Sequence, residues 1–457
     1  MPDQVALLSV PGLRERDLAH MPRLTELAAA GDRAPLVASP PAVTWPVQAN
    51  MMTGLPPSEH GVVANGYYWR DGRDGKPRCE LPYDGVEMWT AWNSVVQRPQ
   101  IWDRLREHDA SLTSAVWFSL LAKGCGAEHA CIPAPIHNPD GSETMWCHTK
   151  PESQYQELID ELGHFPLQHF WGPMANIQGS RWIVSSLLWL AAREKPAFTY
   201  CYLPHLDYAA QKHGPDSPEA IAALGELDIE IGRLADGVAA AWGDAPLWLV
   251  ASEYAIGEVS HASFPNRALR EAGLLEVRTD DDGRERIDFA ATPAWVLVDH
   301  QVGHVFVRDR DAGVIAKAAD VLGSLEGIAE VWDAQEQERQ GVRHERSGDL
   351  VLISEGHSWQ AYYWWLDDAL APRFARTIDI HNKPGYDACE QFWLPELAKE
   401  HGAGVPLDAS LVRGSHGAPP RTEAQRGVLL SSRKGTFIEQ PTADVDVCEI
   451  VLRQFGV

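Results

Sequence analysis

The chain has 457 residues, of which 45% are hydrophobic and 23% charged, as is ordinary for a globular protein. Its formal net charge is −25 and it has no Lys/Arg-rich run, which argues against a nucleic acid polymer or an anionic membrane surface as a partner. No apolar run approaches the roughly 18 residues of a transmembrane helix. We therefore expect no nucleic acid and no membrane partner, and a small anion remains the expected ligand.

The start of the chain carries no basic segment ahead of an apolar one, so we expect no signal peptide and a cytoplasmic location. Seven widely spaced cysteines without a CxxC pair indicate reduced, mostly buried thiols.

The first 65 residues alternate between strand and helix patterns. Val5–Val10 is a short apolar run typical of a buried parallel strand, and Met21–Ala30 has apolar residues at helical spacing. After a loop with several prolines, Pro46 suits the first turn of another helix and Gly54 suits its end. Thr44 is therefore expected at or just before a helix N-terminus.

Residues 66–180 have an irregular pattern rich in Trp, Pro and Gly, with helices expected near 98–108 and 151–163. Alternation then resumes. The expected strands are Ala197–Leu203, Ala245–Ala251, Trp295–Val307, Ile328–Trp332, Leu350–Ser354 and Gly427–Ser431. The expected helices are Pro218–Trp242, Asn266–Gly273, Ala312–Leu325 and Val445–Gln454.

This alternation predicts an α/β fold whose mostly parallel central sheet is covered by helices on both faces. Residues 263–345 are expected to form a small inserted α+β subdomain, between core parts 1–262 and 346–457. Ligands of such sheets bind at the carboxyl ends of strands. Four polar residues fall there or in loops: Thr44, Asp207, Glu253 and His416.

A hydroxyl at a helix N-terminus faces unpaired N–H groups and the positive end of the helix dipole, an arrangement that binds phosphate. Taken alone, Thr44 is better explained as an N-cap residue. The segment Ala42–Gly66 changes this, because Thr-Trp-Pro opens a helix that ends in Thr-Gly, and a Leu-Pro-Pro-Ser-Glu-His-Gly-Val turn leads to Asn65. The segment resembles the nucleophile segment of the nucleotide pyrophosphatase/phosphodiesterase branch of the alkaline phosphatase superfamily.

The resemblance implies an alkaline phosphatase-like α/β/α sandwich in which Thr44 is the nucleophile and Asn65 hydrogen-bonds a phosphoryl oxygen. Leu-Pro-His-Leu-Asp-Tyr matches the family segment that supplies an aspartate, here Asp207, to a first metal ion. Gly-Ser-His-Gly matches the late His-Gly that completes that site with His416, and Ser-Glu-Tyr matches the Ser-Asp-His of a second metal site, with Glu253 in the aspartate position.

Three ligand positions of the family are altered. The first strand ends at Ser9 and Val10 without a carboxylate, Tyr254 stands where the family has a histidine, and Gln211 replaces a histidine of the first metal. A standard two-zinc site cannot be assembled from what remains. We expect one divalent ion rather than two, with zinc preferred and manganese or iron as alternatives.

Other residues could complete the ligand set. Asp379 and His381 are two apart, so both could face one side of an extended segment before the turn at Lys383–Gly385, and we include them as candidate ligands. His205 and the pair His300/His304 are better explained as histidines that hydrogen-bond to backbone or help packing.

The sequence therefore predicts a metal-dependent phosphoryl-transfer hydrolase that acts on a small phosphorylated molecule through a threonine nucleophile. The alternative is a degenerate family member, non-catalytic or with a single metal, that binds such a molecule. A phosphonate or sulfate ester stays open as substrate. The aromatic cluster Trp359–Trp365 either belongs to the core or forms an apolar shelf for a diester.

Overall fold

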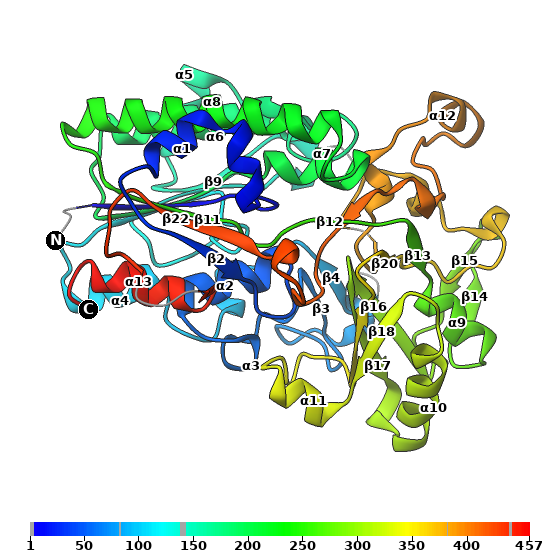
Figure 1. Ribbon diagram of the computed structural model, residues 1–457. Coiled ribbons are helices and arrows are strands. Elements are labelled where there is room, and N and C mark those ends of the chain that lie inside the picture. The colour runs from blue at the N-terminus through cyan, green and yellow to red at the C-terminus, as the bar shows by residue number, and fades with distance from the viewer. Residues whose placement is uncertain (1–3, 82–83, 138–142, 382, 438–440) are drawn as a thin grey trace.

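The computed structural model describes residues 4–81, 84–137, 143–381, 383–437 and 441–457 (Figure 1). Its largest sheet has the strand order β23-β2-β22-β11-β1-β10-β5-β6-β9. Five neighbouring pairs are parallel, and three, made by β22 with β11 and β2 and by β6 with β9, are antiparallel. The predicted α/β fold with a mostly parallel central sheet is confirmed. The strands are β1 (Val5–Ser9), β2 (Arg33–Val37), β5 (Ser114–Trp117), β6 (His129–Pro133), β9 (Cys147–Lys150), β10 (Phe198–Tyr202), β11 (Leu247–Ala251), β22 (Gly427–Ser431) and β23 (Thr442–Ala443).

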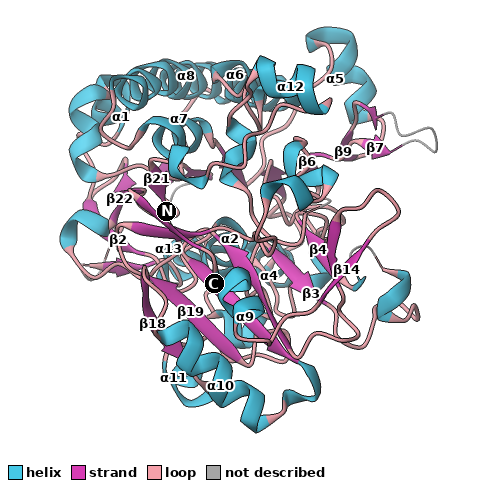
Figure 2. Ribbon diagram, turned by 90° about the vertical axis from the view of Figure 1, so that its right-hand side faces the viewer, coloured by secondary structure: helices cyan, strands magenta, loops and turns pink. Residues whose placement is uncertain are grey.

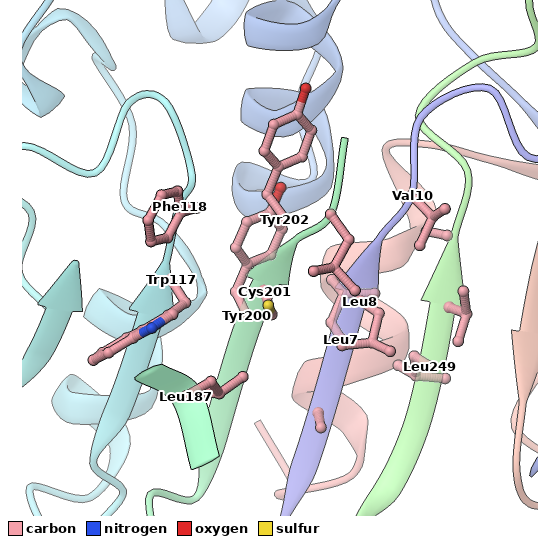
Figure 3. Close-up of a cluster of buried hydrophobic side chains, with 14 of the residues drawn as sticks. Leu7, Leu8, Val10, Trp117, Phe118, Leu187, Tyr200, Cys201, Tyr202 and Leu249 are labelled. Carbon is pink, nitrogen blue, oxygen red and sulfur yellow. The ribbon is translucent and has the colours of Figure 1, made fainter. Parts of the chain in front are cut away.

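The central strands are buried along their whole length because helices cover both faces of the sheet. Figure 3 shows the result, with side chains of β1, β5, β10 and β11 packed side by side in one core. On one face lie α1 (Pro22–Leu27), α5 (Gln154–Leu162), α6 (Ile177–Ala191), α7 (His205–His213) and α8 (Pro218–Trp242) (Figure 1). On the other lie α2 (Thr44–Thr53), α3 (Pro57–His60), α4 (Ile101–His108) and α13 (Asp446–Arg453).

A second, antiparallel sheet has the order β16-β17-β19-β18 and its own hydrophobic core. Figure 2 shows this sheet below the main one, with helices α9, α10 and α11 beside it. The elements are α9 (Pro265–Glu271), β16 (Ala294–Asp299), β17 (Val302–Val307), α10 (Ala312–Gly323), β18 (Ile328–Trp332), α11 (Ala334–Arg339) and β19 (Leu350–Ser354).

Two expectations about this region are wrong. Trp295–Val307 is not one strand but the hairpin β16–β17, because the chain reverses at His300, whose φ is 61°. β19, which the sequence assigned to the second part of the core, pairs with β17 and β18 in the small sheet. The small sheet therefore takes residues from both sides of the expected boundary between 345 and 346.

The aromatic cluster Trp359–Trp365 lies in the second core, where Tyr362, Tyr363 and Trp365 have no exposed surface. It is a packing element and not a shelf in a pocket. The remaining short strands pair as β3 (Gly66–Tyr68) with β4 (Val86–Met88), β7 (Ile136–His137) with β8 (Glu143–Thr144), β12 (Gly257–Glu258) with β21 (Gly414–Ser415), β13 (His261–Ser263) with β20 (Ser358–Gln360), and β14 (Val277–Thr279) with β15 (Glu285–Ile287); α12 is Pro395–His401. Within the described ranges, no helix has the length and apolar character needed to cross a membrane.

Candidate active site at the carboxyl edge of the main sheet

Thr44 is the first residue of α2, as predicted, and follows Val43 in extended conformation. The helix ends at Gly54 in the left-handed conformation (φ 74°), which glycine adopts without a Cβ clash. Thr44 is buried and lies in the wall of a cavity. Its Oγ1 lies 3.0 Å from the hydroxyl oxygen of Tyr254, so the two hydroxyls share a hydrogen bond.

Asn65 supports the start of α2. Its Oδ1 accepts a hydrogen bond from the backbone N–H of Trp45 (2.8 Å), and its Nδ2 donates to Asp299 (3.1 Å). The side chain has no exposed surface and is not among the described residues that line the cavity. Its role as a donor to a phosphoryl oxygen stays a prediction, and in this structure its amide holds the first turn of the helix.

Asp207 and His416 come together from distant parts of the chain, on α7 and just after β21. His416 Nε2 lies 4.0 Å from Asp207 Oδ1. Among the described residues neither atom has a hydrogen-bond partner, although both are buried. His416 Nδ1 donates to the carbonyl of Ala42 (2.9 Å), which leaves the lone pair of Nε2 free.

The charges of this pair follow from burial. Burial away from solvent raises the pKa of the Asp207 carboxyl to about 6. The amide of Gln211 acts in the opposite direction and lowers this pKa. Burial also lowers the pKa of His416 well below its usual value, with the nearby His300 acting in the same direction. At neutral pH we therefore assign a neutral imidazole beside a mostly ionised carboxylate.

Glu253 is enclosed in a hydrogen-bond network behind this pair. Its Oε1 accepts from the Ser9 hydroxyl (2.7 Å) and from Gln48 Nε2 (2.8 Å). Burial raises the pKa of Glu253 to about 8, so the carboxyl is mostly protonated at neutral pH. Ser9 is the last residue of β1, the strand at whose end the resemblance implies an aspartate, and its hydroxyl bonds Glu253 directly.

Four rings lie in contact in a row beside the network. Tyr254 stacks on His416 with 3.6 Å between ring centroids, and His300 stacks on Tyr386 at 3.5 Å. The two histidine rings between them are 4.0 Å apart, with their planes tilted by 38°. His300 Nδ1 is fixed by Asp299 Oδ1 at 2.8 Å. His300, expected to hydrogen-bond to backbone or to help packing, packs against two rings and bonds a carboxylate, and the hairpin turn brings it into the cavity wall.

The resemblance implies two metal ions. The residues at the first metal position supply only part of a ligand set, and those at the second position do not fit an ion. At the first position Asp207 and His416 offer two buried, unpartnered donor atoms. The third position is Gln211, whose Oε1 already accepts from the hydroxyl of Tyr386 and from Gln391 Nε2. An ion here would take its remaining ligands from substrate or water.

At the second position, Glu253 is held by Ser9 and Gln48, and the ring of Tyr254 takes the place of an imidazole. Within the described part of the chain, no three His, Cys, Asp or Glu side chains converge on a point that could hold an ion. Glu253 is therefore a hydrogen-bonded carboxyl in this structure, in contrast to the ligand role that the sequence predicts.

Asp379 and His381 lie in the cavity wall but do not join Asp207 and His416 in a ligand cluster. Ile378 and Ile380 line the same wall, so this segment does not alternate between two faces as a strand would. His381 Nδ1 lies 3.3 Å from the carbonyl oxygen of Met88.

Two other histidines are held by hydrogen bonds, His304 to backbone groups, as expected, and His205 to a carboxylate. His205 Nε2 bonds Glu226 (2.8 Å), and His304 donates from Nε2 to the carbonyl of Val63 (3.0 Å) and accepts at Nδ1 from Gly348 N (3.1 Å). Neither lies in the cavity wall as described.

The cavity has a volume of about 430 Å³ and opens beside Thr44 and Asp207. Sequence reasoning missed its aromatic wall, which includes Trp89, Trp171 and Tyr208. A buried ion cluster fixes this wall. Lys383 Nζ bonds the carbonyl of Thr377 (2.8 Å) and the carboxylates of Asp387 and Glu390 (2.8 Å each), and Glu390 accepts from Trp171 Nε1 (2.9 Å).

Known proteins share this architecture. A family model described as type I phosphodiesterase / nucleotide pyrophosphatase matches residues 5–387. An uncharacterized pyrophosphatase/phosphodiesterase of Schizosaccharomyces pombe is 24% identical over 238 residues, which are 51% of this chain and 40% of that protein. The match thus spans well under half the length of the yeast relative.

Two solved structures superpose over almost the whole chain. Phosphonoacetate hydrolase from Sinorhizobium meliloti has a TM-score of 0.61 at 16% identity, covering 99% of this chain and 96% of its own. Human ectonucleotide pyrophosphatase / phosphodiesterase 5 has a TM-score of 0.61 at 14% identity, covering 99% and 95%. At these identities the likeness shows the fold, and it confirms the predicted alkaline phosphatase-like sandwich.

Proposed function

Because the chain belongs to the type I phosphodiesterase / nucleotide pyrophosphatase family, whose members are phosphoric ester hydrolases, we propose that it hydrolyses a small phosphoric ester with Thr44 as nucleophile. One observation carries the proposal. The Thr44 hydroxyl lies at the N-terminus of α2 in the cavity wall, and Asp207, whose Oδ1 lies 4.0 Å from His416 Nε2, is in the same wall.

In the proposed reaction, Thr44 Oγ1 forms a bond to phosphorus as the ester oxygen of the leaving group departs. The Thr44 proton passes to a base. Two free acceptors are at hand, the Asp207 carboxylate and the lone pair of His416 Nε2. Water then breaks the Thr44–phosphorus bond, which releases the second product and restores the hydroxyl.

The N-terminus of α2 contributes positive potential but few donors. Pro46 has no N–H, and the N–H of Trp45 already donates to Asn65. The hydroxyl of Tyr254 is a further donor next to Thr44, because burial raises the pKa of Tyr254 and keeps the phenol protonated. We propose that these groups, rather than a full set of helix N–H groups, orient the phosphoryl oxygens.

Enzymes of this family generally depend on divalent metal ions. Asp207 and His416 would hold a single ion, zinc by preference and manganese or iron otherwise, and it would supply positive charge to a phosphoryl oxygen. While an ion is held, these two groups would be ligands and not proton acceptors, so the Thr44 proton would pass to water, and Tyr254 would still position the Thr44 hydroxyl.

A second candidate function is binding of a phosphorylated small molecule without turnover. The closed second metal position favours it, since Ser9, Gln48 and Tyr254 fill the place where the resemblance implies a second ion. This candidate predicts saturable binding of a phosphate ester that is not consumed.

The two candidates are separated by turnover of 4-nitrophenyl phosphodiesters by wild type, Thr44→Ala and Thr44→Ser. The hydrolase proposal expects release of nitrophenol that Thr44→Ala abolishes and Thr44→Ser keeps in part. Turnover by Thr44→Ala equal to that of wild type would overturn it, and binding without turnover by any of the three would favour the binding protein.

A further inference from the structure

Asp299 lies between the two halves of the candidate site. It is the last residue of β16, in the small sheet, and only 1% of its surface is exposed. A buried carboxyl group is costly unless hydrogen bonds satisfy its oxygens. Here Oδ2 accepts from the backbone N–H of Asn65 (2.9 Å), and Oδ1 accepts from Asn65 Nδ2 (3.1 Å) and His300 Nδ1 (2.8 Å). Asp299 therefore joins the residue that supports α2 to a residue of the cavity wall.

The bonds to Asn65 hold the start of α2. Asn65 gives both its backbone N–H and its side-chain NH₂ to Asp299, which leaves Oδ1 for the backbone N–H of Trp45 (2.8 Å). An amide side chain has nearly the same shape when its oxygen and nitrogen ends are exchanged, so the carboxylate decides which end faces the helix. Trp45 follows Thr44 directly, across one planar peptide unit. Through Asn65, Asp299 thus holds the backbone next to Thr44.

The bond to His300 holds the opposite side of the site. His300 is the turn residue after β16, with a φ of 61°, and it lines the cavity. Its ring stacks on Tyr386 with 3.5 Å between centroids and lies 4.0 Å from the ring of His416. His416 in turn faces Asp207, with 4.0 Å between Nε2 and Oδ1. Because Asp299 accepts from Nδ1, it fixes the rotation of the ring against which His416 lies.

We infer that Asp299 is a positioning residue that fixes the Thr44 hydroxyl relative to His416. It acts through Asn65 on one side and through His300 on the other. Asp299 itself is not among the described residues that line the cavity, so its effect on a reaction there is indirect. The inference rests on the proposed function for the rates that test it, whereas the hydrogen bonds are tested without substrate.

Asp299→Asn is the first test, because it keeps the shape of the side chain but replaces one acceptor oxygen by an NH₂ group. In either orientation this NH₂ faces an N–H group of Asn65, and a flip of Asn65 would turn its own NH₂ toward the Trp45 N–H. We expect kcat for a 4-nitrophenyl diester to fall by about 10- to 100-fold, with KM changed by less than about 3-fold. An unchanged kcat, or a rise in KM alone, would overturn the inference.

Asp349→Asn is the matched control. Asp349 directly precedes β19 of the same sheet, and its carboxylate accepts from Arg70 Nη2 (2.7 Å) and from the backbone N–H of Val307 (2.7 Å), away from the described cavity wall. The substitution should lower stability and leave kcat within about 2-fold of wild type. Equal losses of kcat in both variants would show that any damage to the small sheet suffices, and would overturn the role of Asp299.

Hydrogen exchange without substrate measures the anchor itself. The amide protons of Trp45 and Asn65 both belong to the network, so exchange there should be at least about 10-fold faster in Asp299→Asn than in wild type or Asp349→Asn. Peptides of β1 serve as the internal reference for an intact fold. Unchanged exchange at both amides would overturn the inference. No turnover by wild type, with the exchange difference present, would overturn the hydrolase proposal and leave Asp299 as the anchor of α2.

His300→Asn separates the two sides. Asparagine tolerates a positive φ, and the substitution removes the ring beside His416 while the bonds between Asp299 and Asn65 remain. We expect kcat to fall by about 3- to 10-fold without faster exchange at Trp45. A kcat equal to that of wild type would overturn the part assigned to His300.

Discussion

Thr44 Oγ1 and Tyr254 Oη lie 3.0 Å apart, so a phenol contacts the hydroxyl that the family resemblance makes the nucleophile. The ring of Tyr254 is fixed by stacking on His416 with an angle of 6° between the planes. Both residues are buried. The hydroxyl of Thr44 is thus held by a protein side chain at a position where the resemblance implies the second metal ion.

Replacing Tyr254 by Phe removes this hydrogen bond and keeps the stacked ring. We expect kcat to fall by about 3- to 10-fold, the usual worth of one buried hydrogen bond, with little change in KM. Steady-state kinetics on a 4-nitrophenyl diester measures it. Tyr363→Phe is the control, because the Tyr363 hydroxyl donates to Cys389 Sγ in the second core and should leave kcat unchanged. A faster Tyr254→Phe enzyme would show that the phenol restrains Thr44 instead of orienting it.

Metal content should depend on Asp207 and not on Glu253. Asp207 lies in the cavity wall with a free donor atom 4.0 Å from His416 Nε2. Glu253 is not among the described lining residues; its Oε1 accepts from Ser9 and Gln48, and its Oε2 is buried without a hydrogen-bond partner. Plasma mass spectrometry of protein purified without chelator should find at most one divalent ion per chain. We expect Asp207→Ala to lose it and Glu253→Gln to keep it. Two ions per wild-type chain, or loss in Glu253→Gln, would contradict the closed second position.

The free energy of unfolding should depend on pH because the Glu253 carboxyl is buried. Folding raises its pKa from 4.5 to about 8, so the folded state binds a proton that the unfolded state has released across this interval. The free energy of unfolding therefore falls as pH rises from about 4.5 to about 8 and levels off above. Glu253→Gln removes this loss, and we expect it to be more stable than wild type by roughly 2–4 kcal/mol at pH 9, with no such gain at pH 4. Urea unfolding at both pH values tests this, and a constant difference would contradict it.

Asn65→Ala should loosen the start of α2, because it leaves the Trp45 N–H and a carboxylate oxygen of Asp299 without this partner. We expect a loss of about 1–3 kcal/mol in unfolding free energy together with a lower kcat. Asn50→Ala is the matched control within α2, since Asn50 bonds Asp444 and His60 and is also fully buried. It should lower stability alone. A lower kcat in both variants would show that loss of stability, and not position at Thr44, is the cause.

Much of the fold could be predicted because its elements carry strong local patterns. α8 (Pro218–Trp242) and β22 (Gly427–Ser431) begin and end where the sequence indicates, since Pro marks the start of the helix and Gly that of the strand. Three strands of the main sheet, β5, β6 and β9, lie in the stretch where no strand was expected. They are only four or five residues long, and β6 and β9 begin or end with polar residues. Their apolar runs are therefore too short for a strand pattern to be recognised.

Some residues of the candidate site could likewise be predicted from the sequence, and others could not. Thr44, Asp207 and His416 lie in segments with a specific order of residues, and the structure brings the last two within 4.0 Å. His300 and Tyr386 could not be assigned, because their positions depend on a hairpin turn and on the packing of a distant loop against the sheet edge. The alternation of residues placed His300 within a strand. A single turn residue with positive φ leaves no pattern in the sequence that would mark the turn.

The central claim is that Thr44 becomes covalently bound to phosphorus. The most direct measurement is peptide mass spectrometry of wild-type protein quenched with acid during turnover of 4-nitrophenyl octyl phosphate. The account predicts an octyl phosphoryl group on the peptide that contains Thr44, with release of one nitrophenol for each adduct and no adduct in Thr44→Ala. Steady release of nitrophenol without any adduct, continuing in Thr44→Ala, would contradict it.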